Sequence, residues 1–580
     1  MLDYATFERA IGLNWYAVDP DLQDTVHRLS SPDVHAAAED VLTEMGALFG
    51  GAIAQRAEST DRNPPRLERY DRWGHEIDRV VHHPGALDTK RDIYEAGRAR
   101  AGERLPGVVG TATSYMLNQS ETGMACAVGM TGGVASLVDA FGSDDVKERF
   151  LPHLRASDYD DYWDGAMFLT ERDGGSDLGM ATKTVATHVD GDLWVLNGFK
   201  WFCSNVDADL LATLARPEGA PDGTAGIALF VVPRVRRDGS GNGVRVRRLK
   251  DKLGTKAVPT GEVDFVDAEA YILAGGGSAS ANPSTATDGK GLGRMMGGMV
   301  QGSRLGVAYM GLGIARRAFL ESAIYAAHRR AFRNTIDAHP MVRETLVRMV
   351  MEVEAASALC FEGSTCIERG WQRVWRLVPT LAKYRATRRG IQLASAAIEV
   401  HGGNGYIEDW PLARQLRDAQ CHTIWEGTEN IIALDVLRAI EREDALPPLL
   451  ERVEAAMADA DDPAVASTRD EVRAFADEAQ EAIAYVAAAP KDVHNLHARR
   501  IARYLADLTS AALLVEQAVW ELRERGSARK AAVAKLYASV HLSSRPLRGI
   551  GRDDRIVLDL FDEVTRYGQV PADKLVSVVA

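Results

Sequence analysis

Cysteine is scarce in this sequence, and its scarcity argues against two kinds of site. Only five cysteines occur among 580 residues, the count is odd, and no two of them form a Cys-x-x-Cys pair. This pattern predicts neither a disulfide framework nor a cysteine-based zinc site. It fits a reducing compartment, so we expect a cytoplasmic protein without a structural metal.

Long apolar runs and an excess of positive charge are also lacking. The N-terminal residues MLDYATFERAIG have no apolar core of a secretory signal. The longest clean apolar run lies near Ala225 to Val232, far short of the roughly 20 residues of a membrane span. The net charge of −14 argues against a nucleic-acid or membrane-surface protein as a whole, although a local basic face remains compatible with it.

The chain of 580 residues is long enough to form several domains. Residues 1 to 165 read mostly helical, as in Pro32 to Phe49, where apolar residues recur every three or four positions. The exception is Asn63 to Gly85, whose two prolines, aromatics and charges indicate a structured loop or short hairpin. From about residue 166 to 274, short β-type runs alternate with Asp-Gly and Asn-Gly turns, which predicts a small barrel or sandwich.

The second half of the chain reads helical again. A Gly- and Ser-rich connector at Ala274 to Gly293 precedes long helical segments at 295–331, 340–370, 377–401 and 427–441, which predict a bundle. Pro447 and Pro448 then break the chain before further helices. We therefore expect a mostly α protein with a central β-barrel, divided into a helical domain (1–165), a barrel (166–290), a helical bundle (291–442) and a helical extension (443–580).

The stretch from Ala397 to Leu437 carries the strongest chemical signal. Glu426 lies between Trp425 and Gly427, just before an apolar helix. An indole beside a carboxylate shields it from water, which favours a raised pKa and predicts a catalytic base. Glu429, three residues on, shares that helix face and is the rival candidate, although a helix-start role is sufficient for it.

Four other motifs are ambiguous when taken alone. The loop FLTERDGGSD at 168–177 offers backbone N–H groups to an anion, but a plain surface turn has the same composition. The aromatic run at 198–204 suits a barrel core equally well. Arg304, in a helix of small residues, either snorkels or faces an anionic partner. The arginines at 329, 330 and 333 form either a solvated helix end or a pyrophosphate clamp.

Together these motifs resemble the acyl-CoA dehydrogenase family over roughly residues 60 to 440. In order, they are T-E-x-x-G-G-S-D at 170–177, G-x-K-W at 198–201, KDKLG at 250–254, R-x-x-F at 329–332, GGNGY at 402–406 and IWEGT at 424–428. The runs NPPRLERYDRWG at 63–74 and WEGTENIIALDVLR at 425–438, with the helical C-terminal part, are most similar to the AidB-like branch.

The resemblance implies an FAD-binding fold of helical domain, barrel and four-helix bundle, with the flavin ring between barrel and bundle and a homotetrameric dimer of dimers. Thr170 and Ser176 would bond the flavin and its phosphates, and residues 201–204 would line the ring. Arg329 and Phe332 would reach the pyrophosphate or adenine half from a neighbouring subunit. The complete implied cofactor set is Thr170, Gly175, Ser176, Trp201, Phe202, Cys203, Ser204, Arg329, Phe332, Gly402, Gly403, Thr428 and Asn430.

The resemblance also implies the reaction. Glu426 would abstract the α-proton of an acyl-CoA thioester while the β-hydrogen leaves as hydride to flavin N5. Fixed donors, in the family the N–H of the base and a ribityl hydroxyl, would stabilise the enolate oxygen. Arg304 would orient Glu426 by its charge. An electron-transfer flavoprotein is the usual acceptor; an oxidase stays an alternative, and the acyl chain length is not encoded in any motif.

Four positions depart from the family pattern, and the extension leaves a second function open. Cys203, Arg333 and Glu399 stand where the family commonly has a small hydroxyl residue, a glycine and a glutamine, and Lys256 stands near a common arginine. AidB-like proteins have a C-terminal domain implicated in DNA binding. Residues 441–490 carry 13 acids and 4 bases, whereas residues 491–550 carry 5 acids and 11 bases. That basic face predicts either a DNA-associated protective flavoprotein with vestigial dehydrogenase activity or, as we prefer, a helical face that docks on the acidic remainder of the same chain.

Overall fold

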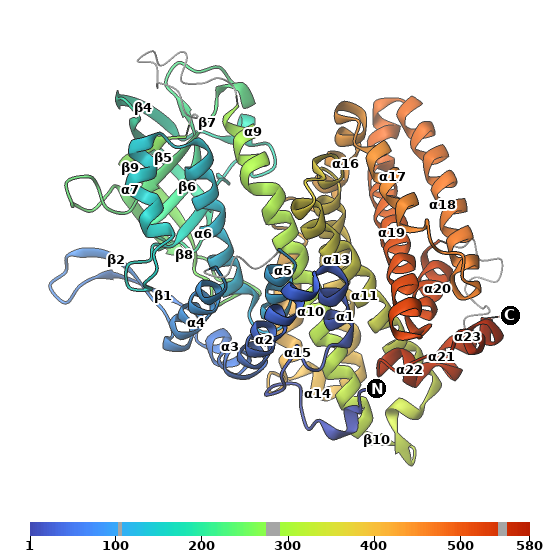
Figure 1. The fold of residues 1–580 in the computed structure, drawn as a ribbon. Helices are drawn as coiled ribbons and strands as arrows, with labels where there is room; N and C mark the ends of the chain where they lie inside the picture. Colours follow the sequence, from blue (N-terminus) through green and yellow to red (C-terminus); the bar gives the residue numbers. More distant parts are fainter. Residues whose placement is uncertain (102–106, 274–289, 543–553, 580) are drawn as a thin grey trace. The chain divides into compact units, whose positions relative to one another are not determined.

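The computed structural model describes residues 1–101, 107–273, 290–542 and 554–579 (Figure 1). Most of the predicted Gly- and Ser-rich connector therefore lies outside the described residues. The chain divides into two compact units: Met1–Gln55 with Arg104–Ser120 and Val307–Ala580, and Arg56–Glu103 with Glu121–Gly306. We call the first the bundle unit and the second the barrel unit. The division into four domains stays a prediction.

The barrel unit is built on a closed ring of five strands. In ring order these are β4 (Val185–Asp190), β5 (Leu193–Ser204), β9 (Thr260–Ile272), β7 (Ala228–Pro233) and β6 (Leu210–Pro217), and β6 pairs again with β4. Two further strands join the ring, β3 (Gly165–Phe168) parallel to β6 and β8 (Val244–Leu249) antiparallel to β9. Alternate side chains fill the interior, among them Trp194, Phe230 and Phe265. The predicted central barrel is confirmed.

Helices and a hairpin complete the barrel unit. The segment predicted as a loop or hairpin forms β1 (Arg66–Tyr70) and β2 (Glu76–Val81). The helices of this unit include α3 (Ala54–Arg62), α4 (Pro84–Ala101), α6 (Thr122–Phe141), α7 (Asp144–Leu154) and α9 (Gly291–Met295). Ser143 caps α7 by accepting a hydrogen bond of 3.4 Å from the Val146 amide.

Among the described residues, a single helix, α6, is long and apolar enough to span a membrane. Its most apolar window has a mean hydropathy of 1.5, and 39% of that window is buried. Its Val134, Leu137 and Val138 pack into a core that includes β6 and β7 side chains. The core helix of a soluble protein meets the same criterion, so this is weak evidence for a membrane.

The bundle unit is helical. Its long helices are α10 (Gln301–His328), which begins in the barrel unit, α11 (Pro340–Glu368), α13 (Val378–His401), α15 (Pro411–His422) and α16 (Glu429–Glu443). Proline stands in the first turn of α11, α13 and α15, where its missing N–H costs nothing. The N-terminal helices α1 (Pro20–Leu29), α2 (Pro32–Leu48) and α5 (Gly107–Leu117) belong to the same unit.

The C-terminal extension packs within the bundle unit. It contains α17 (Leu446–Ala456), α18 (Pro463–Ala488), α19 (Lys491–Arg525), α20 (Arg529–His541), α21 (Asp554–Asp559), α22 (Phe561–Thr565) and α23 (Ala572–Val579). Arg529 and Lys530, two of the bases counted in the basic segment 491–550, are only 3% and 5% exposed, and both pair with the buried Glu354 of α11. For these two residues the burial agrees with the preferred expectation that the segment docks on acids of the same chain, and neither residue can reach a DNA phosphate from the surface.

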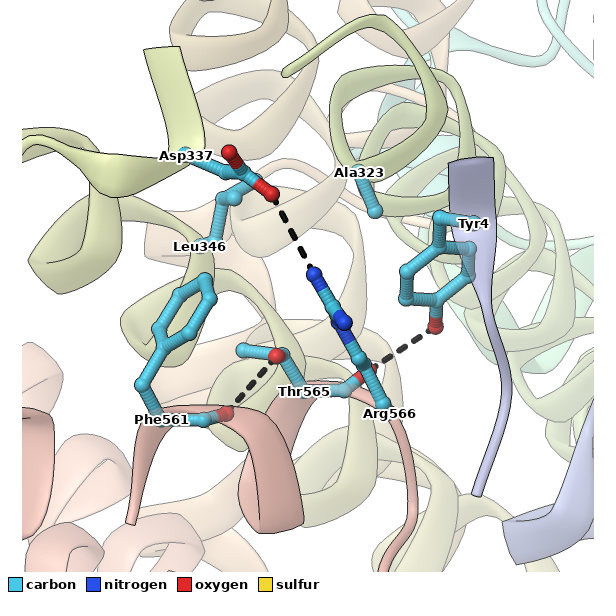
Figure 2. Close-up of a pocket in the computed structure, with 7 residues that line it drawn as sticks. All are labelled: Tyr4, Ala323, Asp337, Leu346, Phe561, Thr565 and Arg566. Carbon is cyan, nitrogen blue, oxygen red and sulfur yellow. Dashed lines mark hydrogen bonds and ion pairs between the residues drawn. The ribbon is translucent and has the colours of Figure 1, made fainter. Parts of the chain in front are cut away.

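The end of the extension also meets the N-terminal segment (Figure 2). Tyr4 donates its hydroxyl to the Thr565 carbonyl at 2.8 Å, and Arg566 donates to Asp337 at 3.3 Å. These side chains line a small cavity together with Ala323, Leu346 and Phe561. Its size admits no more than a water molecule, so this cavity is a packing junction rather than a ligand site.

Candidate functional site

In the barrel unit, backbone hydrogen bonds fix the conformation of the 168–177 loop. Glu171 and Gly174 exchange two backbone hydrogen bonds of 3.2 Å, and the Thr170 carbonyl accepts the Trp201 amide at 2.8 Å. Gly175 and Ser176 are exposed beyond this turn. A Cβ on Gly175 would lie 2.8 Å from the Thr170 hydroxyl, so glycine is needed for the loop to fold back over Thr170. The loop thus presents a hydroxyl and backbone N–H groups to solvent, a donor set suited to an anion or a ring carbonyl.

A buried ion pair fixes this loop to β5. Glu171 accepts hydrogen bonds from the Lys183 amide at 2.7 Å and from the Lys200 ammonium at 2.8 Å. Lys200 is fully buried and also donates to the Leu214 carbonyl at 2.8 Å. Burial alone would raise the pKa of Glu171, but the Lys200 charge and the surrounding donors hold it below its ordinary value.

A β-bulge in β5 turns its aromatic side chains outward. The register with β9 shifts between Lys200 and Cys203, so Trp201 and Phe202 are not buried as their neighbours are. Phe202 is 54% exposed, and the Lys250 ammonium lies 3.1 Å from the centre of the Trp201 ring. The result is an aromatic surface beside the 168–177 loop, on which a planar ring can stack.

The same bulge leaves Cys203 inside the barrel. Its side chain is fully buried in the barrel core, and burial raises the pKa of its thiol far above the ordinary range. Any contact of Cys203 with a ligand is therefore made by its backbone, which narrows the expectation that residues 201–204 all line a flavin. The Ser204 hydroxyl lies 3.1 Å from the Thr260 hydroxyl.

Arg304 lies in the first turn of α10 and is 3% exposed. Its guanidinium is 3.3 Å from the Gln301 side-chain oxygen. Because the side chain is buried, the snorkelling alternative is wrong. A buried guanidinium needs acceptors around it, which is compatible with the predicted role beside a carboxylate.

In the bundle unit, the R-x-x-F residues form a small hairpin. Arg330–Ala331 pairs with Asn334–Thr335, and the two loop residues, Phe332 and Arg333, have φ of +51° and +75°. Positive φ at both positions is the conformation of a type I′ turn, which favours glycine or asparagine. Phe332 is 89% exposed and Arg329 is exposed beside it. The positive φ at Arg333 gives a physical reason for the glycine that the resemblance implies at that position.

The GGNGY segment gives an open backbone surface at the end of α13. Gly402 (φ +60°) and Gly403 are exposed, and a Cβ on either would meet nothing within 4 Å. Gly405 is different, since a Cβ there would lie 2.6 Å from the Ile398 carbonyl. The first two glycines thus leave room for a flat group at the backbone, whereas the third is required by packing.

Residues 423–428, the catalytic-turn candidate, connect α15 to α16. Glu426 has a φ of +56° and Gly427 a φ of +108°. A left-handed glutamate costs on the order of 1–3 kcal/mol and persists only where its surroundings enforce it. Thr428 begins α16, and its side chain makes no capping hydrogen bond to the helix. The N-terminal amides of α16 therefore have the orientation and the partial charge that bind phosphate groups.

The comparisons with known proteins agree with this arrangement. The AidB N-terminal domain family matches residues 7–161, and the acyl-CoA dehydrogenase middle and C-terminal domain families match residues 166–268 and 289–441. The acyl-CoA dehydrogenase homologue AidB of Escherichia coli (strain K12) is 32% identical over 440 residues, which are 71% of this chain and 76% of that protein. The chain belongs to the acyl-CoA dehydrogenase family. Its AidB-like character, predicted from the sequence, is confirmed by the same matches.

A further sequence relative and a solved structure extend the similarity over more of the chain. Acyl-CoA dehydrogenase family member 11 of Caenorhabditis elegans is 29% identical over 463 residues, 76% of this chain and 73% of that protein. The crystal structure of ACDH-11 from that organism in complex with C11-CoA superimposes with a TM-score of 0.85 at 27% identity and covers 96% of both chains. The acyl-CoA dehydrogenase family consists of FAD-dependent enzymes, so the predicted fold class, enzyme class and cofactor are confirmed.

Two residues beside the 423–428 turn, Glu429 and Lys383, make contacts that the sequence did not predict. Glu429 accepts a hydrogen bond of 2.6 Å from the Arg388 guanidinium on α13, so the rival base is engaged in an ion pair at the helix start. Lys383 is buried in α13 and donates to backbone carbonyls of the turn. Sequence analysis missed Lys383. The available signal was weak, a lysine directly after the mostly apolar run Val378–Ala382.

Proposed function

We propose that this protein oxidises the Cα–Cβ bond of an acyl-CoA thioester, with Glu426 as the base and FAD as the hydride acceptor. The observation that carries the proposal is the left-handed conformation of Glu426 beside Gly427, directly before the α16 N-terminus. A non-glycine residue held at positive φ stores strain and persists only where its surroundings enforce that conformation. Its occurrence at the predicted base supports a catalytic role.

The residues described above fit FAD. The Gly175–Ser176 loop and the outward Trp201 and Phe202 suit a flavin ring and its polar edge. The exposed glycines at 402 and 403 leave room for adenine, and Thr428 and Asn430 open the helix that would bind the pyrophosphate. When bound, FAD supplies the acceptor for the β-hydride.

The protein side of the reaction is a proton transfer. The Glu426 carboxylate takes the α-proton, the Cα–H electron pair becomes the new C=C bond, and the hydride leaves Cβ. The product is the α,β-unsaturated thioester, and the proton stays on Glu426 until solvent removes it. The enolate-like oxygen that forms needs fixed donors, for which the Glu426 amide is the protein's candidate. Arg304 is the proposed charge that orients the carboxylate.

Substrate and partners are proposed from the relatives and from exposed elements. The C11-CoA complex of ACDH-11 supports an acyl-CoA as the substrate. A hairpin with an 89% exposed phenylalanine supports delivery of Arg329 and Phe332 to a neighbouring subunit, as in a homotetramer. An electron-transfer flavoprotein is the proposed acceptor in the cytoplasm. We also propose that the chain has four domains, among them the barrel at 166–290 and the bundle at 291–442.

An anaerobic titration tests the proposed function. FAD-loaded protein is mixed with straight-chain acyl-CoAs from short to long, the flavin absorbance band is followed, and the products are analysed by mass spectrometry. We expect bleaching with at least one chain length and a product two hydrogens lighter than its substrate. If no acyl-CoA bleaches the bound flavin, the proposed function is wrong.

A further inference from the structure

Lys383 spans the turn that carries Glu426. Its side chain comes from α13 and is 1% exposed. The ammonium donates to the Thr423 carbonyl at 3.1 Å and to the Gly427 carbonyl. Thr423 is the first residue of the 423–428 turn, and Gly427 directly follows Glu426. One side chain therefore connects both ends of the segment in which the proposed base is held.

The two carbonyls make a strong site for an ammonium. Thr423 ends α15, where unpaired carbonyls and the helix dipole concentrate negative charge. Burying a lysine is costly unless its donors are satisfied, and these two carbonyls satisfy two of its three. The Gly427 carbonyl belongs to the same peptide plane as the Thr428 amide, so the bond also fixes the start of α16.

Lys383 is a cation in this region, whereas its neighbour His422 is neutral. His422 is fully buried, and among the described residues neither of its ring nitrogens has a hydrogen-bond partner. Burial first, and the charge of Lys383 second, lower the pKa of His422 to about 3. His422 is thus neutral at ordinary pH and packs 6.0 Å from the Trp425 ring, adding bulk rather than charge.

We propose that Lys383 is a positioning residue for the dehydrogenation, an inference that rests on the proposed function. By holding the carbonyls of Thr423 and Gly427, it enforces the consecutive left-handed conformations of Glu426 and Gly427. Without it, the turn relaxes toward ordinary φ values and both the carboxylate and the amide of Glu426 move. Lys383 does not contact the reacting atoms; it acts through the backbone of the base.

Lys383→Met tests this, because methionine keeps the length and apolar stem but has no donor. We expect the variant to retain FAD and to bind acyl-CoA with little change in affinity. The rate constant of flavin reduction in a single turnover should fall about 10- to 100-fold, the range that a displacement near 1 Å produces. Lys383→Arg, which keeps the charge and the donors, should recover part of the rate.

Lys530→Met is the matched control. Lys530 is also a buried lysine of the bundle unit, but its partners are Asp21 and Glu354, outside the proposed site. Both methionine variants should lower the melting temperature, and only Lys383→Met should slow flavin reduction. Equal slowing in the two variants, or loss of FAD from Lys383→Met in parallel with its unfolding, would overturn the proposal in favour of a structural role.

Hydrogen exchange provides a readout that does not depend on activity. In Lys383→Met or in Lys383→Arg, whichever folds, the amides of residues 424–428 should exchange faster than in the wild type, more so with methionine, while the middle of α15 and α16 stays protected. Unchanged exchange in the turn contradicts the positioning role. Faster exchange in the turn of a protein whose flavin no acyl-CoA bleaches would support the role of Lys383 in holding the turn but refute the proposed reaction. Failure of the positioning role and failure of the proposed function are therefore distinguishable.

Discussion

At the scale of single residues, Glu171 and Lys200 belong to motifs of the proposed site but support it from inside the protein rather than contacting a ligand. The sequence placed Glu171 and Lys200 in two family motifs but gave neither a role. In the structure they pair at 2.8 Å inside the barrel unit, and the Trp201 amide bonds back to Thr170. The pair thus joins the phosphate-binding loop candidate to the strand that presents the aromatic side chains.

Removing one partner should cost more than removing both. Lys200→Met leaves Glu171 buried without its counter-charge, which costs about 3–5 kcal/mol. In the double variant Glu171→Gln/Lys200→Met no charge is left unpaired, so its loss should be smaller than that of Lys200→Met alone. Urea unfolding of the variants measures both values. Equal or larger loss in the double variant would show that the pair's charge interaction is not what stabilises the loop.

Sequence reasoning could find the site residues that stand in motifs, but not the strand irregularity or the buried lysine that support them. Glu426 and Gly427 were placed correctly as a turn before a helix because glycine and the helix start are visible in the sequence. The β5 bulge was invisible, since the strand's pattern does not show which of Trp201 to Cys203 turns inward. Lys383 was missed because a lysine in a helix reads as a solvated position, and only the fold shows which carbonyls lie around it.

At the scale of elements, the 330–335 hairpin allows a role in cofactor binding to be tested separately from a role in packing, because its Phe332 is exposed. Phe332→Ala removes a side chain that is 89% exposed, so the free energy of unfolding should change by less than about 0.5 kcal/mol. FAD retention during gel filtration should nevertheless fall if Phe332 contacts the cofactor of a neighbouring subunit. Met341→Ala, at an 82% exposed residue of α11, is the control and should retain FAD. Full retention by Phe332→Ala would exclude this contact.

Elements bounded by clear turn signals were predicted well, and short or irregular ones were not. The short β-type runs predicted between residues 166 and 274 include those that form β6, β7 and β8, because turn residues separate these runs. The parallel strand β3 was missed, since four small and apolar residues have no period of their own. Helix α15 is absent from the predicted helical segments, since its 12 residues lie between two glycine-containing motifs.

At the scale of the whole molecule, the extension is held in the bundle unit by buried charges. Arg385 connects Glu352 and Asp507, Arg452 pairs with Glu362 at 2.6 Å, and Arg529 and Lys530 share Glu354. Counting charges predicted a basic segment in residues 491–550 but could not show which bases are paired. Pairing depends on contacts between helices far apart in the sequence, here α20 with α11.

Glu354 should make stability depend on acid pH. Burial alone would raise its pKa, but Arg529 and Lys530 lower it from 4.5 to about 2. A carboxyl whose pKa is lower in the folded state stabilises the fold above its unfolded pKa and loses that effect as pH falls toward the folded value. The wild type should therefore exceed Glu354→Gln by about 3 kcal/mol near neutral pH, and the gap should narrow from pH 4.5 downward. Urea unfolding at several pH values measures it; a constant gap contradicts the assigned pKa.

The same pairing bears on DNA. Lys491, Arg499, Arg500 and Arg503 stay exposed on the first half of α19, whereas Arg523 and Arg525 pair with Asp459 and Asp24. We predict that the full-length protein retains no duplex DNA at low salt in a gel-shift assay, because few phosphate-binding bases remain in one place. Salt-sensitive retention that is lost when the four exposed bases are changed to glutamine would instead support the DNA-associated alternative.

The most direct test of the central claim compares two carboxylates three residues apart. Glu426→Gln keeps the shape of the turn but removes the base, whereas Glu429→Gln removes the partner of Arg388. We expect the Glu426→Gln protein to retain FAD but to be no longer bleached by an acyl-CoA that bleaches the wild type, with flavin reduction slowed by at least about 10²-fold. Glu429→Gln should be reduced at nearly the wild-type rate. Normal bleaching of the Glu426→Gln protein would contradict the assignment of Glu426 as the base.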